Sequence, residues 1–289
     1  MSNIDTRSRE TAHTEFESWL GVRMLEAGAE SARIELPYKE ENSNPGRQVH
    51  GGVVASAMIV AAERAANADA PESANRARGI VTANVAYLAS AVGEAIIAEA
   101  RTLRRGKELR YLRSDAVNAE GKPLGTATII YRTAPQDDPP PYPFSVDRSR
   151  DADGEVLPLG KMLTGAPFIS KVGISAVQMK DGVARLNLAP REENLDRDGR
   201  VHDGVVAALL DTCGSIAAWS LVTPKRGLRA STVAIDVNYI NRAPSVELIA
   251  RAVTTGARRE IFFNRVEIET ADGLRIADGT VIYRIVIPD

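Results

Sequence analysis

The sequence is poor in the residues that build disulfide frameworks, metal centres and membrane spans. Its 289 residues include one cysteine, Cys213, and three histidines. A single cysteine allows no internal disulfide and fits a reducing compartment. No apolar run reaches the roughly 18 residues that a membrane span needs, and residues 1–15 lack the apolar core of a signal peptide. These absences predict a soluble, cytoplasmic protein that does not enter a membrane.

The sequence also lacks an excess of either charge. The 36 basic and 38 acidic residues give a formal net charge of −2, and the Lys and Arg side chains are scattered. This distribution disfavours nucleic acid and anionic membrane surfaces as partners. There is no glycine-rich nucleotide motif, no His or Cys cluster with metal-ligand spacing, and no Ser-His-Asp arrangement. The sequence therefore implies no metal and no nucleotide cofactor.

The chain contains one segment twice. The sequence VHGGVVASAMI at Val49–Ile59 returns 152 positions later as VHDGVVAALLD at Val201–Asp211. A period of this length exceeds that of solenoid repeats, so each copy should be a complete domain. The same offset relates Gly21 to Gly173, Glu40–Asn42 to Glu192–Asn194, Tyr87 to Tyr239, and Ile130–Arg132 to Ile282–Arg284.

The segment between the copies is typical of a linker. Six prolines and a charged stretch between Thr133 and Pro158 disfavour regular structure. We therefore predict an N-terminal domain over residues 1–133, a proline-rich linker over 134–160, and a C-terminal domain over 161–289. A linker of this length would let the two domains dock face to face.

Each copy shows the same order of secondary structure. Residues 52–68 and 204–222 are almost entirely apolar and rich in helix formers, which predicts a helix buried on every side. Alternating segments follow, as in residues 231–240, 247–255 and 262–270, and turn signals separate them. The prediction is an α+β fold in which one buried helix is wrapped by an antiparallel meander of about five strands.

This pattern resembles the hotdog fold of acyl-coenzyme A thioesterases, in particular the phenylacetate-pathway-like branch. The resemblance covers residues 21–132 and 168–284. The family motif is an Asn, then His-Gly-Gly, then an acidic residue nine positions after the His. Copy one supplies the first part of this motif with Asn44, His50, Gly51 and Gly52, and copy two supplies the acid, Asp211. The remaining motif positions depart from the family, with Ile59 for the acid, Asp196 for the Asn and Asp203 for the first Gly.

The resemblance implies an intrachain pseudo-dimer with a continuous sheet and an active site assembled across the domain interface. Asn44, His50, Gly51 and Gly52 would then face Asp211 to make one intact site, and Thr232 would add a hydroxyl where copy one has Ile80. The complementary pairing of Ile59 with Asp196 and Asp203 would be inactive. The substrate would carry coenzyme A, and chains of this family often pair again, so we expect a homodimer.

The chemistry of thioester hydrolysis requires these residue types independently of the resemblance. It needs a group that activates water or attacks directly, and donors for the oxygen that becomes negative. Gly51 and Gly52 would let the thioester carbonyl approach free N–H groups at a helix N-terminus. Asp211 lies in an apolar helix, where an unpaired carboxylate costs several kcal/mol, so its burial indicates a function. It could be a general base or a nucleophile, or a structural residue bonded to Thr212 or Ser215.

The supporting residues have more ordinary alternative interpretations. Asn44 would orient water or the thioester, although an Asn beside Pro is often only a turn former, and Thr232 would hold water or the acid. His50 recurs as His202, which favours a structural role in packing and in bonding the turn backbone. Glu63 lies one helical turn beyond Ile59 and could serve a second site, but the adjacent Arg64 favours an ordinary salt bridge.

Two basic clusters could bind the phosphates of coenzyme A through bidentate hydrogen bonds. They are Arg104, Arg105 and Lys107 in copy one, and Arg258 and Arg259 in copy two.

Two other functions fit the sequence less well. A hotdog enoyl-coenzyme A hydratase would place an Asp shortly before its active His within an Asp-x-Asn-Pro-x-His pattern. Here Asn44-Pro45 is followed by Gly46, and the His comes only at position 50. A non-catalytic acyl-coenzyme A binding module is compatible with the altered motif of copy one, but the surviving motif residues are those that one catalytic site needs. The acyl group is not specified by the sequence.

Overall fold

The computed structural model describes residues 13–68, 79–133, 146–151, 156–225 and 227–286. The N-terminal copy contains α1 (Glu15–Leu20), β1 (Arg23–Ala27), β2 (Ser31–Leu36), η1 (Glu40–Asn42), α2 (Gly51–Asn67), β3 (Gly79–Tyr87), β4 (Ile96–Arg105), β5 (Leu109–Val117) and β6 (Pro123–Arg132). The C-terminal copy contains α3 (Pro158–Thr164), α4 (Pro167–Val172), β7 (Ile174–Lys180), β8 (Val183–Leu188), η3 (Glu192–Asn194), α5 (Asp203–Trp219), β9 (Arg229–Tyr239), β10 (Leu248–Arg258), β11 (Ile261–Thr270) and β12 (Arg275–Val286).

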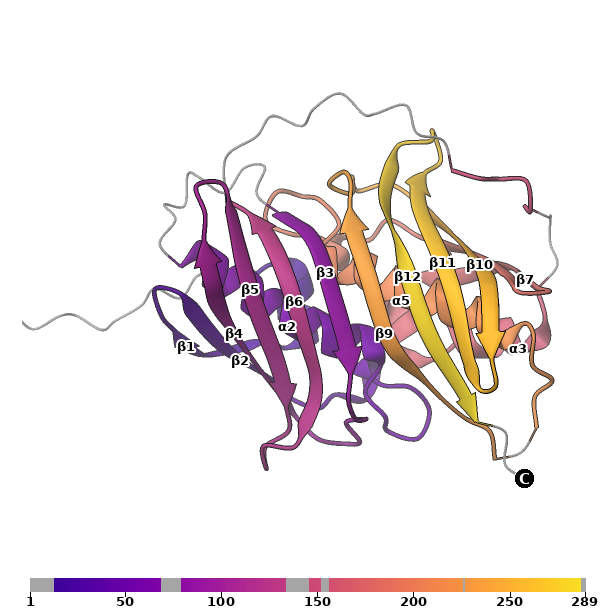
Figure 1. The fold of residues 1–289 in the computed structure, drawn as a ribbon, viewed down its shortest axis with the longest axis horizontal. Helices are drawn as coiled ribbons and strands as arrows, with labels where there is room; N and C mark the ends of the chain where they lie inside the picture. Colours follow the sequence, from indigo (N-terminus) through magenta and orange to yellow (C-terminus); the bar gives the residue numbers. More distant parts are fainter. Residues whose placement is uncertain (1–12, 69–78, 134–145, 152–155, 226, 287–289) are drawn as a thin grey trace, which may run out of the picture.

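The described strands form one antiparallel sheet in the order β1-β2-β4-β5-β6-β3-β9-β12-β11-β10-β8-β7 (Figure 1). The α+β class and the continuous sheet are as predicted, but two details differ. Each copy contributes six strands instead of about five. The sequence did not indicate β1, which is largely exposed and carries no alternating apolar pattern. The meander is also incomplete, since β3 pairs with β6 and not with β4.

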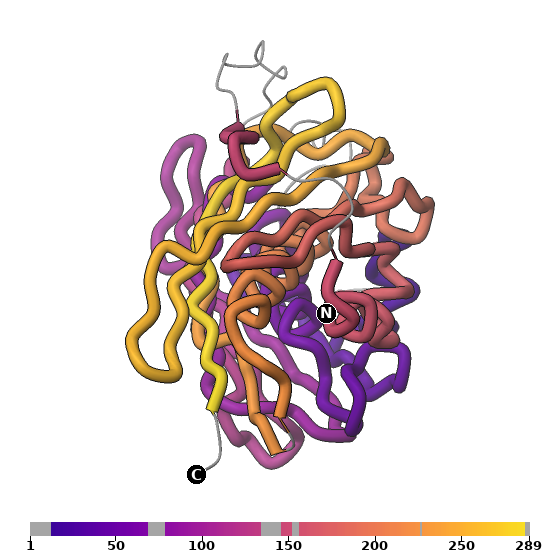
Figure 2. Tube along the Cα trace, turned by 90° about the vertical axis from the view of Figure 1, so that its right-hand side faces the viewer, coloured from indigo at the N-terminus to yellow at the C-terminus, as the bar shows by residue number. Residues whose placement is uncertain are grey.

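The long helices α2 and α5 lie on one face of the sheet, which curves around them (Figure 2). In α2 every residue from Gly52 to Ala62 is buried, in agreement with the prediction of a helix without a solvent face. One apolar core runs through both copies and includes residues of both helices. The two domains therefore fold against each other and share one interior.

The two helices approach each other most closely at small residues. A Cβ atom on Gly52 would lie 2.6 Å from the Cβ of Ala208, and one on Gly204 would lie 2.7 Å from the hydroxyl of Ser56. The Ser56 hydroxyl donates to the carbonyl oxygens of Gly52, at 2.7 Å, and of Gly204, at 3.2 Å. The first turn of each helix thus packs against the middle of the other.

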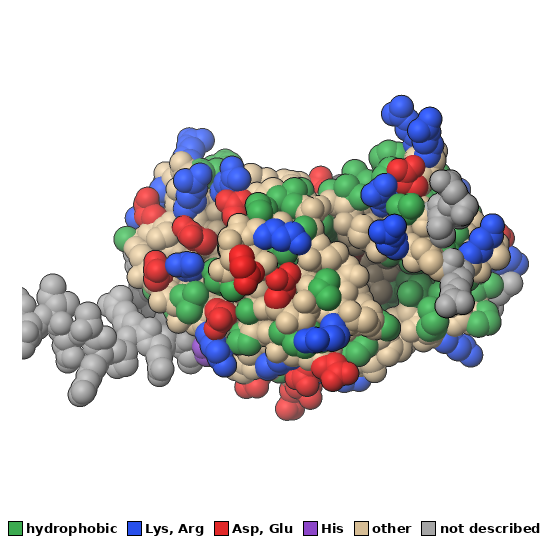
Figure 3. Space-filling model, turned by 90° about the horizontal axis from the view of Figure 1, so that it is seen from below, with side chains coloured by type: hydrophobic (Ala, Val, Ile, Leu, Met, Phe, Trp, Pro, Cys, Tyr) green, Lys and Arg blue, Asp and Glu red, His purple; other side chains and the backbone are tan. Residues whose placement is uncertain are grey.

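The surface carries charges of both signs. On the face shown in Figure 3, basic and acidic side chains are interspersed, in agreement with the scattered charges of the sequence. Among the described residues, no helix combines the length and apolar character that crossing a bilayer requires.

The segment between the copies is only partly described, and residues 134–145 and 152–155 lie outside the described residues. Helix α3 already begins at Pro158, within the stretch that the sequence assigns to the linker. The described part of the linker is held to the C-terminal sheet by ion pairs. Arg148 contacts Glu269 at 2.7 Å, and Asp151 contacts Arg251 at 2.9 Å.

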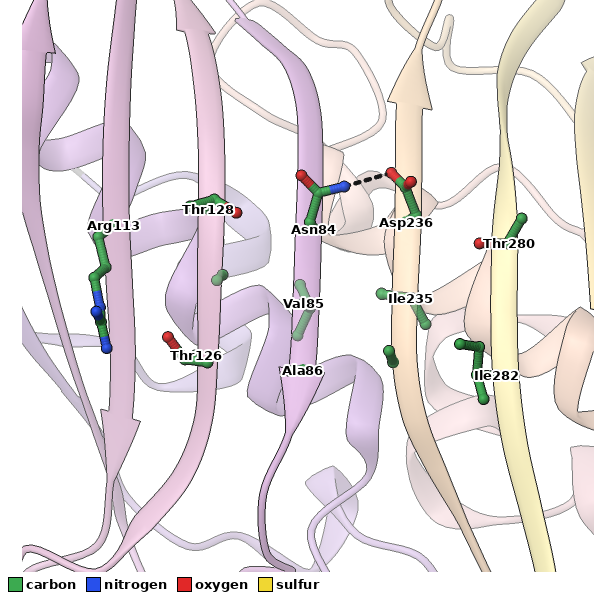
Figure 4. A pocket seen from close by; sticks show the side chains of 12 residues that line it. Asn84, Val85, Ala86, Arg113, Thr126, Thr128, Ile235, Asp236, Thr280 and Ile282 are labelled. Atoms are coloured by element: carbon green, nitrogen blue, oxygen red, sulfur yellow. Dashed lines mark hydrogen bonds between the residues drawn. The ribbon is translucent and has the colours of Figure 1, made fainter. Parts of the chain in front are cut away.

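The two copies meet at the antiparallel pair of β3 and β9. Asn84 lies opposite Asp236, and its side-chain amide donates to the carboxylate at 2.6 Å (Figure 4). These two positions are 152 residues apart, so they are equivalent in the two copies. The pseudo-twofold axis that relates the domains therefore passes through this pair.

The close contact of α5 with the sheet gives a test of the fold. A Cβ on Gly214 would lie 2.5 Å from the Cβ of Val281, so we expect Gly214→Ala to lower the free energy of unfolding. Overpacking costs about 1–3 kcal/mol, which exceeds the gain of about 1 kcal/mol that Ala brings to a helix. Urea denaturation would measure the difference. Gly256→Ala is the control, because no atom lies within 4 Å of its added Cβ; equal stability of the two variants would contradict the packing.

Candidate active site

Asp211 is a buried carboxylate held by hydroxyl groups. It lies in α5 with 2% of its surface exposed. The Thr232 hydroxyl on β9 donates to its Oδ1 at 2.6 Å, and Ser215, one helical turn further along α5, provides another side-chain hydrogen bond. Burial raises the pKa of Asp211 to about 6, although both hydrogen bonds act in the opposite direction. The group therefore titrates near neutrality, as a general base in an enzyme should.

The turn of the N-terminal copy lies directly against this carboxylate. A Cβ on Gly51 would be 3.0 Å from Asp211 Oδ2, so a side chain at position 51 would meet the acid. The contact follows from the packing of the helices, because the first turn of α2 rests on the middle of α5. The structure thus brings together Gly51, Asp211 and Thr232, which come from both copies.

The N–H group of Gly52 is not free, contrary to the sequence prediction. It donates to Nδ1 of His50 at 2.9 Å, and His50 thereby caps α2. The His50 ring stacks on Phe168, with ring centroids 4.8 Å apart, and burial lowers its pKa to about 4. His50 is therefore a neutral structural residue. Gly51 keeps its N–H without a protein acceptor among the described residues.

Asn44 is fixed through its backbone. Its N–H donates to the carbonyl of Gln48 at 2.7 Å, in the same way that the equivalent Asp196 donates to Arg200. Within the described part of the chain, the Asn44 side chain has no hydrogen bond to another residue. A role of Asn44 in orienting water or the thioester stays a prediction.

Tyr87 is a site residue that the sequence did not assign. It ends β3, and its ring atoms Cε1 and Cζ lie 3.6 and 3.7 Å from the position of a Gly51 Cβ. Its hydroxyl is buried and has no hydrogen-bond partner in the described structure. Burial and the nearby Asp211 raise its pKa well above the usual value. The recurrence of Tyr87 as Tyr239 was visible in the sequence, but we used it to align the two copies and not to assign a role to Tyr87.

The pseudo-symmetric position holds a different set of ionisable groups. Nε2 of His202 lies 3.4 Å from the Glu63 carboxylate, and the backbone N–H of Ile80 donates to Asp203 Oδ2 at 3.2 Å. The prediction that Glu63 pairs with Arg64 is wrong, because Arg64 points to Glu17, with Nε and Oε1 3.1 Å apart. Neighbours in sequence on a helix point in different directions, and His202 of the other copy is nearer.

The charges of this second cluster are coupled. Burial opposes a charge on His202, but Glu63, together with Glu17 and Asp203, outweighs this effect and raises the His202 pKa to about 9. Burial, assisted by repulsion from Glu63, raises the pKa of Asp203 to about 7. Ile59, at the position equivalent to Asp211, is fully buried. Asp203 is equivalent to Gly51. The second cluster therefore has a carboxylate at a position where the first site has no side chain.

Asp196, at the position equivalent to Asn44, is bound by a cation. Arg242 forms a salt bridge with it and contacts the Asp198 carboxylate at 2.6 Å. Asp196 is therefore paired with a residue of its own domain. The expectation that this second cluster is inactive stays a prediction.

The predicted coenzyme A clusters lie on two hairpins. Arg104, Arg105 and Lys107 are exposed at the β4–β5 turn, and Arg258 and Arg259 are exposed at the β10–β11 turn. The Arg104 guanidinium lies over the Tyr111 ring at 5.5 Å. Binding of phosphates by these residues stays a prediction. Within the described ranges, no group of His, Cys, Asp and Glu has an arrangement that could hold a metal ion.

Comparison with known families gives a match in each copy. Residues 39–132 match the family described as acyl-CoA thioesterase N-terminal domain, and residues 198–277 match the thioesterase superfamily. A protein of Halobacterium salinarum, provisionally described as an esterase, is 34% identical over 145 residues. That alignment covers 95% of the relative but only 47% of this chain, as expected if the relative is a single copy.

Solved structures share the complete two-domain fold. An acyl-CoA thioesterase II from Mycobacterium marinum, TesB2, superposes with a TM-score of 0.66 at 15% identity, covering 95% of this chain and 98% of its own. A protein from Alicyclobacillus acidocaldarius, described as having a hot dog fold, gives a TM-score of 0.61 at 18% identity, covering 96% and 100%. The double hotdog architecture is therefore established.

The second cluster gives a testable pH dependence of stability. Since the pKa of Asp203 is raised in the folded state to about 7, this group costs stability as the pH rises from about 4 through 7. We expect Asp203→Asn to remove that cost and keep the bond to Ile80. Urea unfolding should show the variant more stable than the wild type at pH 8, with a smaller difference at pH 5. Asp181→Asn, at an exposed turn, should follow the wild type at both values; an Asp203→Asn advantage that is equal at both would contradict the assignment.

Proposed function

The chain belongs to the thioesterase superfamily and is an acyl-CoA thioesterase, and we propose that it hydrolyses its substrate at a single composite site between the two hotdog domains. One observation carries the proposal. The buried carboxylate of Asp211, from the C-terminal copy, lies beside the unused N–H of Gly51 at the start of α2, from the N-terminal copy. A base and an oxyanion donor are thus adjacent in this site.

The geometry supports a general-base mechanism. Asp211 accepts a proton from a water molecule, and the water oxygen forms a bond to the thioester carbonyl carbon. The carbonyl electron pair moves to oxygen, where the Gly51 N–H and the dipole of α2 stabilise the negative charge. The carbonyl then re-forms, the carbon–sulfur bond breaks, and the coenzyme A thiolate takes the proton from Asp211. The products are a free acid and coenzyme A.

The hydrogen bond of Thr232 uses Oδ1 of the carboxylate and not Oδ2. Thr232 binds Oδ1, so Oδ2, which faces Gly51, is the oxygen nearest the expected position of the water. Two hydroxyl donors restrain the rotation of the carboxylate without neutralising it. We therefore favour a general base over a nucleophile for Asp211, and Thr232 acts by positioning it.

Substitution of Asp211 tests the proposal. We expect Asp211→Asn to lower the rate of acyl-CoA hydrolysis at least ~100-fold, because the amide cannot accept the proton. In the wild type, kcat/KM should fall as the pH drops below about 6, where Asp211 becomes protonated. Release of free thiol from a panel of acyl-CoA thioesters measures both effects.

Glu63→Gln is the matched control, since Glu63 lies at the same interface in the second cluster. This variant should keep the turnover of the wild type. Near-normal turnover by Asp211→Asn would remove Asp211 from the mechanism. Loss of turnover in Glu63→Gln alone would move the active site to the other cluster.

We also propose that two chains associate through the solvent face of the central strands. A depression of 540 Å³ crosses this face, and its lining combines apolar side chains such as Ala86 and Ile282 with polar and charged ones such as Asn84, Arg113 and Asp236 (Figure 4). Such a surface supports a homodimer, as the resemblance implies. Sedimentation analysis should then give twice the chain mass of 31.1 kDa. A solution mass of one chain would contradict the dimer.

Three finer expectations stay predictions of the sequence. They are the phenylacetate-pathway-like subtype, the cytoplasmic location, and catalysis without a metal or other cofactor.

A further inference from the structure

The composite site has one oxyanion donor fewer than its sequence motif indicates. Tetrahedral intermediates of acyl transfer are usually stabilised by two hydrogen-bond donors. The motif suggests the N–H groups of Gly51 and Gly52, but His50 occupies the N–H of Gly52. Of the two motif glycines, Gly51 therefore supplies the one available backbone donor, and a second donor has to come from another residue.

Tyr87 has an unused donor beside Gly51. Its hydroxyl is closed off from solvent and finds no acceptor in the described structure. A buried hydroxyl without a partner costs about 1–3 kcal/mol, so such groups are uncommon unless a ligand completes them. The ring is only partly buried, and its Cε1 atom lies 3.6 Å from the point that a Gly51 Cβ would occupy. Asp211 Oδ2 lies 3.0 Å from the same point.

The other copy shows that the hydroxyl could have been satisfied. Tyr239 occupies the equivalent position, and its hydroxyl donates to the carbonyl of Asp203 at 2.9 Å. The residue equivalent to Asp203 is Gly51, with the same backbone groups. The fold therefore permits a bond from the tyrosine to the first residue of the helix, but only the second cluster makes it. The unpaired hydroxyl belongs to the site that carries the acid.

We propose that the Tyr87 hydroxyl is the second oxyanion donor of the composite site and binds the thioester carbonyl oxygen together with the Gly51 N–H. This inference rests on the proposed function and adds a catalytic residue to it. When water adds to the carbonyl carbon, the carbonyl oxygen gains the electron pair and accepts both hydrogen bonds. Tyr87 keeps its proton throughout, in agreement with the raised pKa that burial and Asp211 give it.

The experiment compares Tyr87→Phe with Tyr239→Phe. Tyr87→Phe should lower kcat about 100-fold, the usual effect of removing one oxyanion donor. Its melting temperature should be unchanged or higher, because the lost hydroxyl has no partner among the described residues. Tyr239→Phe should do the opposite, with a lower melting temperature and a wild-type kcat, because it loses a hydrogen bond outside the active site.

A ligand without a carbonyl separates catalysis from pocket shape. The S-alkyl-CoA thioether that matches the best substrate should bind the wild type and Tyr87→Phe with the same Kd. A wild-type kcat in Tyr87→Phe would overturn the inference and leave the proposed function intact. Weaker binding of the thioether, or a lower melting temperature, would give Tyr87 a structural role and also overturn it. If the wild type releases no thiol from any acyl-CoA while Asp211→Asn is equally inactive, both the function and the inference fail.

Discussion

The contact between α2 and α5 determines where every other feature of the site can lie. Gly52 packs on Ala208 and Gly204 packs on Ser56 at distances that leave no room for another atom. Because each helix starts against the middle of the other, the donors at a helix N-terminus meet side chains from the partner domain. A larger residue at position 52 or 204 would separate the helices, and the carboxylate of Asp211 would lose its position beside Gly51.

The same geometry occurs twice, and the two occurrences differ in how they compensate a buried charge. In the composite site, burial raises the pKa of Asp211 to about 6, and the hydroxyl groups of Thr232 and Ser215 hold the carboxylate. In the other cluster, the imidazolium of His202 attracts the carboxylates of Glu63 and Asp203, which repel each other. A buried carboxylate without a neighbouring cation readily accepts a proton. A carboxylate paired with an imidazolium has a lower affinity for a proton, because the cation stabilises its negative charge. The difference in pairing thus distinguishes the composite site, where Asp211 can act as a base, from the second cluster, where the ionisable groups bind one another.

The sequence was sufficient for the fold, and it selected Gly51, Asp211 and Thr232, which the structure brings together, because both depend on local patterns that occur twice. The apolar stretches specified α2 and α5, and the mismatch of Ile59 with Asp211 indicated the position of the acid. The β3–β6 pairing could not be predicted, since it depends on the path of the chain across the sheet. The loss of the Gly52 donor to His50 and the approach of Glu63 to His202 depend on side-chain directions that spacing does not determine.

The pair of Asn84 and Asp236 on the pseudo-twofold axis has a consequence for the history of the chain. In a dimer of identical domains, a residue on the axis faces its own copy, so an Asp would meet an Asp and the carboxylates would repel each other. Joining the domains in one polypeptide removed that restriction and allowed an amide to face a carboxylate. The two halves are now complementary. A C-terminal half released from the chain would therefore bind the N-terminal half in preference to a second copy of itself.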